Sequence, residues 1–167
     1  MPHDDPAPGK VITGSWGLAV TRGLGCQLTN TGAQEIPNNT LTTVAWNSVA
    51  FDSAPSLGFA DMADLTNDEI VLPVDGLWAV WGGVGFEGND TGRREIAVRI
   101  DGSSRMWDVR QIGGSDPTFG RIAVSGLVVG SVGQRLDLRV RHTAGEGIDI
   151  EDSTPPPFFG AALVAHA

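Results

Sequence analysis

Short runs of alternating apolar and polar residues dominate the chain, and turn residues separate these runs. The segment Gln134–His142 shows the pattern most clearly, because Leu136, Leu138 and Val140 share one face while charged side chains occupy the other. A period of two is typical of a half-buried β-strand, and many short strands at regular spacing are typical of a sandwich or barrel. No long segment has a helical period. The sequence therefore predicts an all-β protein.

The same pattern locates the individual strands. Seven segments are predicted with most support: Thr40–Trp46, Glu69–Pro73, Leu77–Phe86, Arg94–Ile100, Arg121–Val129, Gln134–His142 and Phe158–Ala165. Weaker patterns predict strands at Leu24–Thr29 and Met106–Ile112, and a short helical turn at Val11–Thr21. Dipeptides such as Asp101-Gly102 mark the turns between strands.

The stretch WGGVGFEG contains Gly83, Gly85 and Gly88 in the spacing of a dinucleotide-binding loop. That motif requires a helix directly after the glycines, because the helix N-terminus holds the phosphates. Here a turn and the strand pattern of Arg94–Ile100 follow instead. We therefore expect no nucleotide site, and no cofactor.

Neither side of the predicted strand Leu77–Phe86 carries a charged residue. Trp78, Val80, Val84 and Phe86 fill one side, which fits a sandwich core, and the opposite side is small apart from Leu77 and Trp81. A strand that is apolar on both faces is typically covered on both. In a single-domain sandwich the second cover is most simply another subunit. The predicted subunit interface consists of Leu77, Ala79, Trp81, Gly83 and Gly85.

Composition and charge narrow the choice of function. A chain of 167 residues that is 41% hydrophobic is expected to form one packed domain, with the lone Cys26 as a small buried apolar residue. No signal peptide and no transmembrane segment are predicted, so we expect a soluble protein that does not insert into a membrane.

The net charge is −9, and the arginines after residue 92 alternate with acidic residues. This predicts cross-strand ion pairs on a solvated sheet and argues against nucleic-acid binding.

Few residue patterns in the sequence indicate a catalytic or metal-binding site. None of the common catalytic motifs is present, and His142 at the end of an arginine-rich strand is expected on the surface, so no enzyme is predicted. Two acidic clusters could offer oxygen ligands to calcium, although solvated loops explain them as well. They are Asp149–Asp152 and the group Asp61, Asp64, Asp68 and Glu69.

Five tryptophans are many for this length. Trp46 and Trp78 are predicted in the core. Trp16, beside Ile12 and Leu18, is predicted to anchor the N-terminal segment in the pocket of another protein. Trp107, together with Phe119, is the candidate ligand-facing pair, because an exposed tryptophan can stack on a sugar.

Three segments in order resemble the globular head domain of complement component q, which shares the tumour-necrosis-factor jelly roll. They are Ile36–Val44 with its Pro/Asn turn and Thr-rich strand, Pro73–Trp78 with a Pro-x-x-Gly-aromatic turn, and Phe158–Leu163 with a closing Phe-x-Gly strand. The first of these is similar to the bacteriophage branch of the family. Residues 9–25, with Trp16-Gly17, resemble the leader of small phage virion proteins. The chain has no tyrosine where the family places it, so the family's calcium and receptor-contact residues are not carried over.

The resemblance implies an antiparallel jelly-roll sandwich of about ten strands over residues 24–167, preceded by an irregular or helical docking arm over residues 1–23. It implies a homotrimer with one sheet around the threefold axis. The favoured function is a bacteriophage virion structural protein made in the host cytoplasm, specifically a minor tail protein in host attachment. A capsid decoration protein and a carbohydrate-binding module that binds a host-surface glycan are the alternatives.

Overall fold

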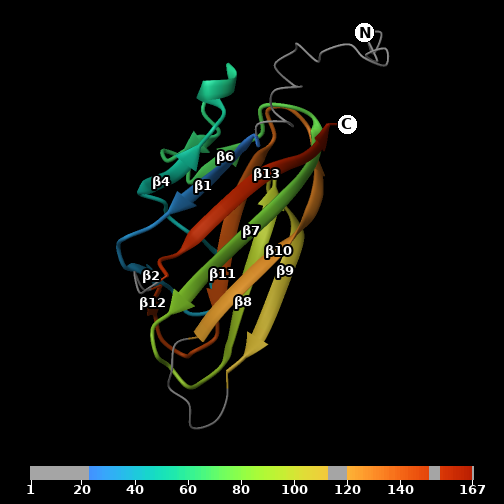
Figure 1. Ribbon diagram of the computed structural model, residues 1–167. Helices are drawn as coiled ribbons and strands as arrows, with labels where there is room; N and C mark the ends of the chain where they lie inside the picture. Colours follow the sequence, from blue (N-terminus) through green and yellow to red (C-terminus); the bar gives the residue numbers. More distant parts are fainter. Residues whose placement is uncertain (1–22, 113–119, 151–154, 167) are drawn as a thin grey trace, which may run out of the picture.

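Two antiparallel sheets face each other in the computed structural model, which describes residues 23–112, 120–150 and 155–166 (Figure 1). The described strands are β1 (Gly25–Thr29), β2 (Gln34–Ile36), β3 (Thr42–Thr43), β4 (Ser48–Asp52), β5 (Ala63–Asp64), β6 (Glu69–Val71), β7 (Gly76–Phe86), β8 (Arg93–Ile100), β9 (Ser103–Gln111), β10 (Gly120–Gly130), β11 (Arg135–His142), β12 (Ile148–Ile150) and β13 (Phe158–His166). A 3-10 turn, η1 (Pro55–Leu57), lies between β4 and β5. The jelly-roll sandwich predicted from the sequence is therefore confirmed.

The first sheet, sheet A, is built around β7. This strand pairs with β10 along one edge and with β13 along the other, and β13 continues to β1 and β4. At the far end of β7, Phe86 pairs with Ile150 of β12, which in turn pairs with β2. The second sheet, sheet B, has the order β5-β6-β11-β8-β9, and β3 pairs with β11 beside β6. Figure 1 shows β7, β10 and β13 in front of β8, β9 and β11.

The core lies between the facing sides of the sheets. Trp78, Phe86 and Phe159 of sheet A are fully buried there, and Leu138 of sheet B is buried with them. Trp46 stacks on Phe159 with ring centroids 6.1 Å apart. The predicted core positions of Trp46 and Trp78 are thus confirmed.

Every strand predicted from the sequence has a counterpart, but Thr40–Trp46 contributes only two ladder residues. The backbone N–H of Ala45 donates to Gln34 Oε1 at 2.9 Å, and that of Trp46 donates to Asp68 Oδ1 at 2.7 Å. These side-chain acceptors take the place of a neighbouring strand. The short strands β2, β4, β5 and β12 were not predicted, because segments of two to five residues give too little alternation to be recognised.

The glycine motif at Gly83, Gly85 and Gly88 leads to strand β8 and not to a helix, as expected. At the hairpin between β8 and β9, Asp101 and Gly102 both have positive φ, of 47° and 79°. Two consecutive positive φ angles are the mark of a type I′ turn, so the turn predicted at this dipeptide is confirmed.

The expected surface position of His142 is wrong. The side chain is fully buried, with Nε2 2.6 Å from the carbonyl oxygen of Ile36. Its Nδ1 lies 3.3 Å from the backbone N–H of Ala144, which donates to it. The position follows the alternation of β11, since residue 142 has the same parity as the buried Leu138 and Val140.

Candidate functional site

The outward side of sheet A is almost free of charge. In β7, β10 and β13 the cross-strand register places small and apolar residues on this side, with Arg121 of β10 as the one charged residue among them. Charged residues are depleted at the centres of protein–protein interfaces. This face of the sheet is the candidate functional site, and we call it the sheet A face.

The five residues predicted as a subunit interface lie together on the sheet A face. Leu77, Ala79 and Trp81 are half-buried, and Gly83 and Gly85 are buried within the chain itself. The role of these five residues in self-association remains a prediction.

The most exposed members of this face were not predicted from the sequence. Leu127 lies opposite Ala79 and is 59% exposed, while Val129 lies opposite Leu77 and is 74% exposed. A signal was present, because the outward positions of β10 between Ala123 and Val129 carry no charge. Contiguous exposed apolar patches are a common feature of interaction sites.

Two aromatic rings lie over glycines on the sheet A face. A Cβ atom on Gly160 would meet the indole of Trp81 at 2.5 Å, and one on Gly83 would meet the Phe158 ring at 2.7 Å. Trp81 Nε1 donates a hydrogen bond to Gln27 Oε1 at 3.0 Å. The small residues of this face therefore make room for aromatic rings of the same chain.

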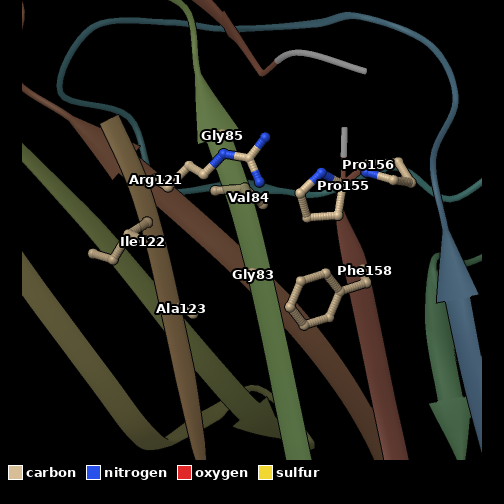
Figure 2. A pocket seen from close by; sticks show the side chains of 9 residues that line it. All are labelled: Gly83, Val84, Gly85, Arg121, Ile122, Ala123, Pro155, Pro156 and Phe158. Atoms are coloured by element: carbon tan, nitrogen blue, oxygen red, sulfur yellow. The ribbon is translucent and has the colours of Figure 1, made fainter. Parts of the chain in front are cut away.

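A shallow hollow of about 220 Å³ lies at one end of this face (Figure 2). Gly83 and Gly85 form its floor, Phe158 and Pro155 stand on one side, and Arg121 of β10 reaches in from the other. The charged group of the face thus lies at its end, away from Leu127 and Val129.

The outward side of sheet B has the opposite character. Arg141 lies opposite Glu95 and its Nε donates to Glu95 Oε2 at 2.7 Å; Arg139 Nε likewise lies 2.6 Å from Asp137 Oδ2. Arg135 bonds both Asp64 and Glu69. Hydrogen bonds from Asn67 and Arg135 lower the pKa of Asp64 below its usual value. The predicted ion pairs on a solvated sheet are confirmed.

Trp107 lies on this charged side of sheet B, in the edge strand β9, and is 70% exposed. It pairs with Ala97 of β8 and lines a groove of about 390 Å³. Its predicted companion Phe119 lies outside the described residues, as do the predicted anchor residues Ile12, Trp16 and Leu18 and the helical turn predicted at Val11–Thr21.

A buried guanidinium closes one end of the sandwich. Arg94 is 1% exposed, lies 5.4 Å over the Phe86 ring, and donates to the carbonyl oxygens of Asn89 and Thr91. Burial lowers the pKa of Arg94. No carboxylate lies within ion-pair distance of it in the described parts of the chain. Arg94 therefore ties down the loop between β7 and β8, a structural role that the sequence did not reveal.

Three of the four residues in one of the acidic clusters considered for calcium have other partners. Asp64 and Glu69 bond Arg135, and Asp68 accepts the Trp46 backbone N–H. No group of three potential metal ligands occurs in the described ranges, which exclude residues 151–154. Nor do those ranges contain a helix of the length and apolarity needed to span a membrane.

No protein-family model matches the sequence, and no curated protein aligns with it at a significant level. Solved structures do resemble it. Eiger TNF from S. frugiperda superposes with a TM-score of 0.61 at 13% identity, covering 87% of this chain and 94% of that one. Murine APRIL at pH 5.0 gives a TM-score of 0.63 at 12% identity, covering 84% and 98%. The protein thus has the jelly-roll fold of the tumour-necrosis-factor family.

Proposed function

We propose that this protein is a self-associating structural protein, a homotrimer in which the sheet A face of each chain packs around the threefold axis. The observation that carries the proposal is the pair of exposed apolar residues Leu127 and Val129, which lie opposite Ala79 and Leu77 on the sheet A face. Covering such residues removes apolar surface from water, which favours association by about 25 cal/mol per Å² before the entropy of association is subtracted.

We further propose that the trimer is a surface component of a bacteriophage virion, namely a minor tail protein involved in host attachment. The support is the resemblance of Ile36–Val44 and of residues 9–25 to phage virion proteins. In this proposal residues 1–23 bind another virion protein, with Trp16 as the anchor. A capsid decoration protein is the alternative, since it uses the same trimer and the same arm.

Two measurements test these statements. Sedimentation equilibrium of the purified chain should give three times the chain mass, and a monomer at all concentrations would reject the trimer. Gold-labelled antibodies against the protein should mark the tails of purified virions. Labelled capsids would favour the decoration protein, and the absence of the protein from purified particles would reject the virion role.

The arm is tested separately. Deletion of residues 1–22 should leave a trimer that no longer enters virions, because residues 25–166 form all the strands of the two described sheets. Normal incorporation of the shortened protein would reject the arm as the anchor without bearing on the trimer.

A further inference from the structure

The groove at Trp107 combines one exposed aromatic ring with fixed polar groups. Trp107 and Val109 of β9 line it together with Leu41 and with Ala97 of β8, the residue that pairs with Trp107. No hydrogen bond from Trp107 is found in the described part of the chain. The indole therefore offers a flat face beside the groove.

The polar part of the groove is held in place by an ion-pair triad. Glu95 Oε1 lies 2.7 Å from Arg93 Nε, and Glu95 Oε2 accepts from Arg141 Nε at 2.7 Å. The Glu95 side chain is 14% exposed, whereas those of Arg93 and Arg141 are 44% and 34% exposed. The two guanidinium groups retain N–H groups that no described residue binds, and the carboxylate retains lone pairs. Donors and acceptors thus lie side by side in the groove that Trp107 also lines.

We propose that this groove binds a saccharide, with the C–H face of a pyranose ring on Trp107 and its hydroxyl groups on Glu95, Arg93 and Arg141. Sugar hydroxyls both donate and accept hydrogen bonds, which matches the mixed set of the triad. The polarised C–H groups of a pyranose face complement the negative face of an indole ring. A volume of about 390 Å³ lies within the range of small-ligand sites.

Other occupants fit this surface less well. The triad carries one net positive charge and its neighbours on sheet B are also ionised, whereas the centre of a protein interface is depleted of charge. A single-stranded nucleic acid needs a positively charged track and several aromatic side chains, and this chain has a net charge of −9. A saccharide needs one stacking platform and a few hydroxyl partners.

The groove lies within one chain and on the sheet opposite the sheet A face. Saccharide binding therefore does not depend on the proposed trimer, so a result that rejects one proposal does not reject the other. A variant with a charged sheet A face should lose the trimer and retain the groove.

The test uses the full chain on an array of neutral hexose, amino-sugar and uronic-acid oligosaccharides, followed by calorimetric titration of the best ligand. Trp107→Ala should bind about tenfold more weakly, because it removes the stacking platform. Trp107→Phe should retain most of the affinity, and Glu95→Gln should lose much of it. Val132→Ala is the matched control, since Val132 is 63% exposed and lies outside the groove.

Each outcome decides the proposal. Binding that is weakened by Trp107→Ala, restored in part by Trp107→Phe and unchanged in Val132→Ala supports it, and falling affinity with added salt assigns the ligand to the uronic-acid class. An array on which the wild-type chain binds no oligosaccharide overturns it. So does a Trp107→Ala variant of unchanged affinity, or a control that loses binding equally.

Discussion

Trp81 Nε1 donates a hydrogen bond to Gln27 Oε1 across strand β13, which lies between the two residues, and the indole covers Gly160 on the way. The contact joins β7, β13 and β1 on the sheet A face. It holds the half-buried indole of Trp81 over Gly160.

Gly160→Ala should destabilise the fold by about 1–3 kcal/mol, because the added methyl group overlaps the Trp81 ring. Urea unfolding measures the change. Gly32→Ala is the control, since its Cβ would meet its nearest neighbour at an ordinary 3.5 Å. In a Trp81→Ala background the same substitution should be nearly neutral, and an undiminished effect there would show that the indole is not the cause.

A double substitution of Leu127→Arg and Val129→Arg should convert the trimer to a folded monomer. In a trimer the two arginines of each chain would bring six positive charges together around the threefold axis, where desolvation of unpaired charge is unfavourable. Sedimentation velocity gives the oligomeric state and circular dichroism the fold. Val132→Arg adds charge at an exposed apolar residue off the sheet A face and should remain trimeric. An intact trimer in the double variant would place the interface elsewhere.

Alkaline pH should weaken the fold through Cys26. Burial, with smaller contributions from Asp52 and Asp61, raises the pKa of the thiol from 9.0 to about 12. The unfolded chain releases this proton at lower pH than the folded chain, so stability is retained below pH 9 and falls above it. The fall reaches at most about 1.4 kcal/mol per pH unit.

The chain has no tyrosine and a single lysine, Lys10, so few other groups titrate in this range. In thermal unfolding between pH 8 and 11, the Tm of Cys26→Ala should fall less steeply with pH than the Tm of the wild type. Equal slopes in the two proteins would contradict this account. In the folded protein at pH 8, Cys26 should also resist thiol reagents.

Arg94→Lys should destabilise the protein by about 1–3 kcal/mol, because a lysine cannot donate in the same fork to the carbonyl groups of Asn89 and Thr91. It would also leave the Phe86 ring without its planar cation. Urea unfolding is the measurement, and Arg105→Lys on the exposed part of β9 is the control. A loss of unfolding free energy no larger than that of Arg105→Lys would mean that the guanidinium is dispensable.

The sequence by itself determined the longer strands and most of the core. Alternation is a local property, because successive side chains of an extended chain point to opposite sides whatever lies beside them. It correctly placed Trp78 and the apolar residues of β11 inside. The same parity also placed His142 inside, and the surface assignment failed because residue type was given more weight than position.

Only the tertiary structure decided which distant residues meet. Trp81 reaches Gln27, Glu95 reaches Arg141, and Leu127 lies beside Ala79 because of strand order and register. Strand order and register depend on how all the strands pack together, and no local pattern encodes them. The shortening of Thr40–Trp46 has the same origin, since Gln34 and Asp68 are brought to its backbone by the fold. Alternation within each strand already marked its uncharged or charged outer residues, but strand order decided which strands share the outer face of sheet A and which share that of sheet B.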